Sequence, residues 1–381
     1  MSLRVDVAPG VLEWAIERSR RDLAELEQRH PKLPEWTTGE RRPTLTQLTK
    51  FARATRTPVG YLLLAEPPDE EVPLADFRTL GDEAIERPSA DLLDTVALVE
   101  QRQAWYRDFA RSVGEPPVPW VGAASTEDSP RAVAGRMREV LAFGVTERAG
   151  FGTWEEARRG LVDAIEAAGV LVMVSGIVGS NSHRRLDPAE FRGFTVIDEY
   201  APVMFVNGAD AKAAQIFTLA HELGHVWLGQ SALDSPRMDV RAEGDVERWC
   251  NAVAAELLVP EADLRQQHDP ARDLGEEAGR LARRYKVSTL VVLHSLHDAQ
   301  LVSWERFRAS YRDQLERAAE RPTQQGGDYY RTQPVRMSRR FTRAVVTSAL
   351  EGQTLYRDAF AMLGCRKQQT FDELARQVGV G

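Results

Sequence analysis

Cysteine is scarce in this chain, which has only two, Cys250 and Cys365, among 381 residues. So few cysteines exclude a disulfide-rich scaffold and are typical of a reducing compartment, so we expect a cytoplasmic protein. No apolar run is long enough to span a bilayer, and residues 1–6 contain no apolar segment of signal-peptide length. We therefore expect no membrane partner.

An excess of positive charge is also lacking, since 49 Lys and Arg face 57 Asp and Glu, for a formal net charge of −8. This balance argues against a nucleic-acid surface over the whole chain, although it leaves room for one local basic patch. The content of apolar residues, 43%, and of charged residues, 28%, is ordinary for a globular protein. The length allows two or three domains with a sizeable core.

Histidine is scarce too, yet two of the seven histidines, His221 and His225, lie four residues apart with Glu222 beside the first. The apolar residues around them predict a helix over about 211–228. On a helix this spacing places both imidazoles on one face, one turn apart, where they can bind a single zinc ion. A glutamate beside them can take a proton from water, as the general base of a metallohydrolase does.

A zinc site of this kind needs a third protein ligand, and Glu247 is the best candidate. It begins a second predicted helix that Pro260 stops, and the alanines of that helix allow close packing. Glu243 and Asp245, just upstream, remain alternatives. On the same helix we expect Cys250 in the core.

Three motifs in this order resemble the ImmA/IrrE family of zinc metallopeptidases. They are the APVMFVN of residues 201–207, the FTLAHELGHxxL of 217–228 and the ExxCNxxAAxLLxP of 247–260. The resemblance implies a zincin-like domain in which His221, His225 and Glu247 bind Zn²⁺ and Glu222 is the base. It also implies site-specific cleavage of a repressor or regulator protein.

Residues 1–65 resemble helix-turn-helix domains of the phage-repressor type, with helices predicted at 11–20, 21–29 and 45–54. The segment that would read DNA, 30–36, contains two prolines and an acid, which suit a major groove poorly. DNA binding through 1–65 and protein docking both remain open.

The whole chain is predicted to be α+β and mostly helical, with a small sheet. Four segments are expected: a helix-turn-helix-like domain (1–65), a linker and long helix (66–128), a zinc metallopeptidase domain (129–310) and a helical C-terminal extension (311–381). The linker is the Pro- and Glu-rich stretch 66–73. Further elements are expected as a long helix at 91–113, helices at 129–141, 154–168, 274–285 and 289–296, strands at 170–174, 194–197 and 203–206, a loop at 322–328 and three short helices in 337–378.

Other candidates for chemistry are weaker. His183, Tyr200 and Tyr285 are each able to donate to an oxyanion, and none is singled out by the sequence. His294 and His297 lack nearby acids, so we expect a core or surface pair rather than a metal site. A strand beside the zinc often pairs with substrate, and the sequence does not choose among the three.

The sequence therefore predicts a zinc-dependent endopeptidase that cuts a protein partner, either a transcriptional repressor or an antitoxin-like regulator. The alternative is a DNA-binding regulator or antitoxin whose metallopeptidase domain acts as a sensor or scaffold. The presence of Glu222 argues against that alternative, because a structural zinc has no use for a base.

Overall fold

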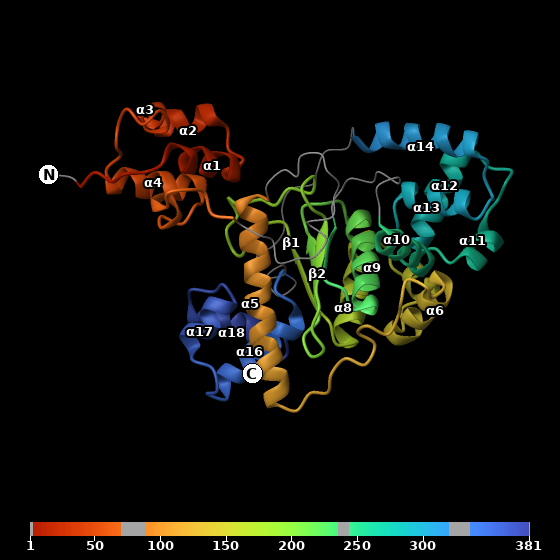
Figure 1. The fold of residues 1–381 in the computed structure, drawn as a ribbon. Coiled ribbons are helices and arrows are strands. Elements are labelled where there is room, and N and C mark those ends of the chain that lie inside the picture. The colour runs from red at the N-terminus through yellow and green to blue at the C-terminus, as the bar shows by residue number, and fades with distance from the viewer. Residues whose placement is uncertain (1–2, 70–87, 235–243, 320–335, 381) are drawn as a thin grey trace. The chain divides into compact units, whose positions relative to one another are not determined.

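The computed structural model describes residues 3–69, 88–234, 244–319 and 336–380, which are mostly helical with one four-stranded sheet (Figure 1). These residues form two compact units. The first comprises the described residues up to 69 together with 88–97, and the second comprises those from 98 onward. No helix within these ranges is both long and apolar enough to cross a membrane.

Besides a 3-10 helix (Tyr61–Leu63) and the start of α5 (Ala90–Ser112), the first unit contains α1 (Pro9–Ser19), α2 (Leu23–Arg29), α3 (Leu33–Thr37) and α4 (Leu45–Thr55). The helices predicted at 11–20, 21–29 and 45–54 are thus confirmed as elements. A closed core forms between them, in which Leu12, Trp36 and Phe51 are buried. The only helix in the segment that would read DNA is α3, which has five residues, with Pro34 in its first turn. The helix-turn-helix assignment stays a prediction.

The sheet of the second unit contains β1 (Leu171–Ser175), β2 (Gly193–Val196), β3 (Val203–Asn207) and β4 (Ala232–Asp234). Its order is β1-β3-β2-β4, with β1 parallel to β3 and the other pairs antiparallel. The three predicted strands are confirmed, whereas the three-residue β4 was not predicted. Since β3 leads directly into the helix that carries His221, the sheet fixes where that helix starts.

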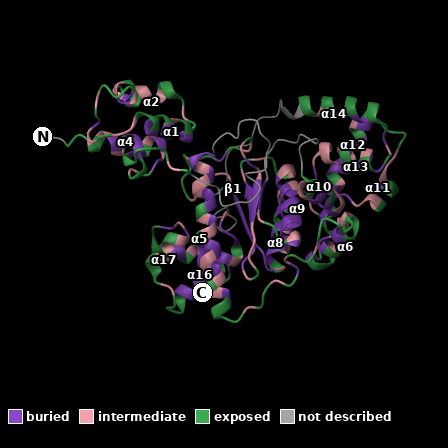
Figure 2. Cartoon of the chain, in the orientation of Figure 1, coloured by how far each residue is buried: buried purple, intermediate pink, exposed green. Residues whose placement is uncertain are grey.

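Helices cover both faces of the sheet. On one face Val172, Val174 and Val206 belong to a core shared with α8 (Trp154–Ala167) and α9 (Lys212–Leu228). Figure 2 shows the buried residues continuing from β1 into α9.

On the other face lies α5 (Ala90–Ser112), the predicted long helix. The amide of its Gln103 donates to the carbonyls of Val196 and Ala201 at 2.8 and 3.0 Å. The ring of Trp105 packs edge-on against Phe341, at 5.6 Å between centroids. Trp105 and Phe109 stack at 5.4 Å between centroids and are both half-buried, so this side of α5 lies partly in the core.

The remaining helices before residue 320 belong to the second unit. They are α6 (Pro130–Leu141), α7 (Val145–Ala149), α10 (Asp245–Leu258), α11 (Glu261–Gln267), α12 (Leu274–Tyr285), α13 (Thr289–Asp298) and α14 (Trp304–Ala319). Among them, α10 packs against α9 and α6 packs against α10. The predicted helix pair α12 and α13 is confirmed, with Ser288 as the N-cap of α13. His294 and His297 both pack against the ring of Phe307, at 5.0 and 4.9 Å between centroids. His294 is exposed and His297 is half-buried, so the two form a surface pair, one of the two arrangements expected.

Three short helices end the chain, α16 (Arg339–Leu350), α17 (Tyr356–Met362) and α18 (Gln368–Gln377), as predicted. The predicted loop at 322–328 and residues 70–73 of the predicted linker lie outside the described residues.

One buried carboxylate joins these helices to the sheet. Glu166, near the end of α8, accepts hydrogen bonds from the Ser338 hydroxyl and from the N–H groups of Val172, Arg339 and Arg340. Burial raises the pKa of Glu166 to about 7, against the opposing effect of these donors. The N-terminus of α16 is thereby tied to β1, an edge strand of the sheet.

Candidate metal centre

The helix α9 places two imidazoles at the centre of the second unit. It ends at Gly229, whose φ of +69° is the left-handed conformation that stops a helix, with its N–H bonded to the carbonyls of His225 and Val226. His221 and His225 are buried one turn apart, and their Nε2 atoms lie 3.1 Å from each other. The rings therefore converge on one point, as the four-residue spacing predicts.

A carboxylate from α10 completes the group. The two oxygens of Glu247 lie 3.1 Å from Nε2 of His221 and 3.2 Å from Nε2 of His225. Within the described ranges these three residues form the only cluster of His, Cys, Asp or Glu that could hold a metal ion.

The three donor atoms fit a tetrahedral metal ion. Ligands at 2.0–2.1 Å from a tetrahedral zinc lie about 3.3 Å from one another, by simple geometry. The two Nε2 atoms lie 3.1 Å apart, close to that value. The Glu247 carboxylate reaches both rings, with Oε2 3.1 Å from Nε2 of His221 and Oε1 3.2 Å from Nε2 of His225. Two neutral nitrogens and one carboxylate are also a donor set that zinc accepts.

The charge of the group suits a cation. Burial raises the pKa of Glu247, but the two imidazole rings beside its carboxylate outweigh burial and hold the pKa well below the ordinary value. The carboxylate is thus ionised and available as a ligand at neutral pH.

Close contact between α9 and α10 brings Glu247 to the histidines. A Cβ added to Gly224 would lie 3.1 Å from the sulfur of Cys250 and 3.4 Å from its Cα. A side chain at 224 would have to push the helices slightly apart, and Cys250 is fully buried against this glycine. The prediction that Cys250 belongs to the core is confirmed.

A further residue orients the first histidine. The Nδ1 atom of His221 lies 3.0 Å from Oδ1 of Asn251, one turn along α10 from Glu247. Because an amide oxygen can only accept, the ring carries its proton on Nδ1, which leaves the lone pair of Nε2 for a metal. Sequence reasoning missed this role, although Asn251 lies inside the third motif.

Glu222 projects toward the sheet. Its carboxylate Oε2 accepts a hydrogen bond from Oγ1 of Thr195, on β2, at 2.6 Å. Both residues are fully buried. Sequence reasoning also missed Thr195, which is separated from Glu222 by 27 positions.

The alternative third ligands do not join the group. Asp245 is highly exposed and pairs with Arg248, and Glu243 lies outside the described residues. Glu256, further along α10, accepts from the N–H of Glu261 at 3.0 Å and has a structural role.

No candidate oxyanion donor is brought to the group. His183 is exposed in its loop. The ring of Tyr200 lies under the guanidinium of Arg111, and the hydroxyl of Tyr285 donates to Asp263 at 2.7 Å. None of these contacts brings one of the three side chains to His221, His225 or Glu247.

Strand β2, which packs against α9, is an interior strand of the sheet. It pairs with β3 on one side and with β4 on the other. The edges of the described sheet are β1 and β4. Among the three predicted strands, only β1 is an edge strand. The edge strand next to β2 is β4, which was not predicted.

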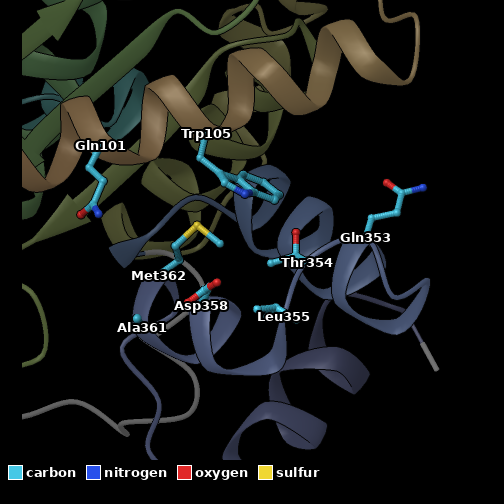
Figure 3. Close-up of a pocket in the computed structure, with 8 residues that line it drawn as sticks. All are labelled: Gln101, Trp105, Gln353, Thr354, Leu355, Asp358, Ala361 and Met362. Atoms are coloured by element: carbon cyan, nitrogen blue, oxygen red, sulfur yellow. The ribbon is translucent and has the colours of Figure 1, made fainter.

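A separate pocket of about 450 Å³ lies between α5 and the C-terminal helices (Figure 3). Trp105 of α5 and Asp358 and Met362 of α17 are among the residues that line it. It contains none of the predicted site residues and is distinct from the metal centre.

Residues 165–297 match the family model described as the IrrE N-terminal-like domain. This IrrE-like segment runs from the end of α8 to α13 and contains all four predicted site residues. Within the chain, 99 residues are 35% identical to the radiation response metalloprotease IrrE of Deinococcus radiodurans. They make up 25% of this chain and 30% of that protein, so the match spans less than a third of the relative. Both matches support the resemblance to the ImmA/IrrE family.

The last helices have a separate match. Residues 337–377, which include α16 and α17, match a family described as a domain of unknown function (DUF8813). The sequence had suggested no chemistry for this extension, and this match assigns none.

Proposed function

We propose that this chain is a zinc-dependent endopeptidase that makes site-specific cuts in a protein partner, a transcriptional repressor or antitoxin-like regulator. The observation that carries the proposal is the triangle of His221, His225 and Glu247, with Glu222 next to it on the same helix. The similarity of the IrrE-like segment to a protein called a metalloprotease supports the same activity. The scarcity of cysteine supports action in the cytoplasm.

Each residue has a distinct task in this proposal. His221 and His225 hold the metal through Nε2, and Glu247 holds it through its carboxylate. When bound, zinc supplies a Lewis acid that polarises a carbonyl and makes water more acidic. Glu222 takes the proton of the attacking water on its carboxylate and then gives it to the nitrogen of the leaving amine. Asn251 keeps the His221 ring in the required tautomer.

The first test is the metal content of the purified, chelator-free protein and of two variants, His221→Ala and Glu247→Ala. We expect about one zinc per wild-type chain and loss of zinc in both variants, since either change removes a ligand. Asp245→Ala is the control, because this carboxylate pairs with Arg248 and should leave the zinc content unchanged. Wild-type protein that cannot be loaded with zinc would refute the site.

The second test concerns cleavage. Zinc-loaded wild type and Glu222→Gln are incubated with a cell extract, and new protein N-termini are identified by mass spectrometry. We expect a few specific termini with wild type and none with Glu222→Gln, which keeps all three ligands and loses the base. Full biological activity of Glu222→Gln would instead favour the sensor or scaffold function.

We also propose that the N-terminal unit docks a protein partner rather than DNA. Several of its arginines have acidic partners: Arg29 pairs with Glu25 and Arg41 with Glu35. These pairs reduce the positive charge that phosphate binding needs. A gel shift with the DNA upstream of the gene tests this, and a retarded band with sequence preference would reject it.

A further inference from the structure

We propose that β2 positions the general base: Thr195 fixes one oxygen of the Glu222 carboxylate, and Gly193 keeps the space that the other oxygen needs. The inference rests on the proposed peptidase function, because it assigns positioning residues to that reaction. It concerns residues of the sheet, outside the three motifs that point to the metal centre.

Thr195 is held rigidly. Its backbone lies in the interior strand, opposite Met204 of β3 on one side and Ala232 of β4 on the other. Its side chain is fully buried and β-branched, so one χ1 rotamer is fixed by the packing. The packing around Thr195 therefore holds the direction of its hydroxyl group.

The hydroxyl of Thr195 is aimed at Glu222. Oγ1 lies 2.6 Å from Oε2 of the carboxylate and 3.3 Å from the carbonyl oxygen of the same residue. The shorter distance is typical of a hydrogen bond from a hydroxyl to an ionised carboxylate. Since the hydroxyl has one proton, the carboxylate is its main acceptor.

Gly193 completes the cradle. A Cβ at this position would lie 2.9 Å from Oε1 of Glu222, 2.6 Å from Cγ2 of Thr218 and 2.9 Å from the carbonyl oxygen of Phe205. Real Cβ atoms do not approach other atoms so closely, and two of the three neighbours are fixed by the helix and the strand. Any side chain at 193 would therefore displace the Glu222 carboxylate.

The helix alone does not fix the base. A glutamate on α9 has three rotatable side-chain bonds, and a general base acts only within hydrogen-bond reach of the proton that it takes. With Oε2 bonded to β2, the carboxylate has one defined place, and Oε1 takes the proton from water. Loss of this restraint should lower kcat by about 10- to 100-fold, with little change in KM, since small misplacements have effects of this size.

The experiment compares Thr195→Val, which keeps the shape and removes the hydroxyl, with the pair Thr195→Ser and Thr195→Ala, which differ only in that hydroxyl. The control is Thr342→Val, which removes a buried hydroxyl on α16 that donates to the carbonyl of Ser338 at 2.8 Å. Zinc content, thermal unfolding, and kcat and KM for a peptide that carries the cleavage site found in the extract are measured for each.

We expect every variant to bind zinc, Thr195→Ser to cleave like wild type, and Thr195→Val and Thr195→Ala to lose kcat. Thr342→Val should lose stability and keep kcat. Equal kcat in Thr195→Ser and Thr195→Ala would overturn the proposal. The comparison of these two variants remains a valid test even when Thr195→Val does not fold.

Crystal structures of wild type and Thr195→Ala give a readout that does not depend on activity. We expect Glu222 to contact β2 in the first and to leave it in the second. The same carboxylate position in both would overturn the positioning role. This comparison remains decisive if wild type cleaves nothing, in which case the peptidase function itself fails.

Discussion

Asn251 tests metal binding at the scale of a single residue, because its substitution should weaken zinc binding without removing a ligand. Its side-chain oxygen lies 3.0 Å from Nδ1 of His221, the ring nitrogen that does not bind the metal in the proposal. Partners of this kind typically change metal affinity by about 10- to 100-fold. We therefore expect Asn251→Ala to bind zinc about 10- to 100-fold more weakly than wild type, measured by competition with a coloured chelator.

Asn251→Asp is the matched variant, since it keeps an oxygen acceptor of the same length. It should hold zinc at least as tightly as wild type, because a carboxylate also accepts from Nδ1 of His221. If Asn251→Ala and wild type had the same affinity, Asn251 would have no part in orienting the ligand.

The chemistry of single residues was largely available from the sequence. The spacing of His221 and His225 determines a shared helical face, and Glu247 emerged as the third member of a group that the fold brings together. Asn251 and Thr195 could not be assigned, because each acts through a contact with a distant part of the chain. No periodicity encodes such a contact.

At the scale of elements, the contact between α9 and α10 determines whether the ligands meet. Gly224→Ala should destabilise the fold by about 1–2 kcal/mol, since overpacking outweighs the gain of about 1 kcal/mol in helix propensity. It should also weaken zinc binding, because Glu247 lies on the displaced helix. Urea unfolding and zinc titration measure the two effects.

Gly135→Ala is the control, because this glycine also lies within a helix and a Cβ there meets nothing within 4 Å. It should stabilise the fold by up to about 1 kcal/mol. Cys250→Ala in the Gly224→Ala background should restore part of the stability, since it removes the nearest atom, at 3.1 Å. No restoration would mean that the helices separate for another reason.

Three strands and a small sheet were predicted, but the order of the strands was not. Short apolar runs between turns identify β1, β2 and β3, whereas β4 has three residues and no pattern that distinguishes it from a loop. The order β1-β3-β2-β4 depends on packing over long sequence separations. The sequence could therefore not tell which strand lies beside Glu222.

For the second unit as a whole, the Glu166 carboxyl makes stability depend on pH. Its pKa is about 7 in the fold and 4.5 ordinarily, so the folded state keeps a proton that the unfolded chain releases. The stabilisation is complete below pH 4.5 and is lost as the pH rises to about 7, a difference of about 3 kcal/mol. Urea unfolding of wild type should show this decline, and Glu166→Gln should lack it.

Glu139→Gln, an exposed change on α6, serves as the control and should keep the wild-type decline. Parallel pH profiles for wild type and Glu166→Gln would show that the Glu166 carboxyl keeps an ordinary pKa in the fold.

The link through Glu166 between β1 and the start of α16 has a consequence for folding during synthesis. The N–H of Val172 on this outer strand is satisfied by Glu166, which Ser338 and Arg339 hold in place. A ribosome delivers β1 well before it delivers residue 338, so the nascent chain presents an unprotected outer strand while the residues between them are made. Uncovered strands of this kind recruit other chains. The start of α16 thus protects β1 from other chains only after residues 338 and 339 have been made.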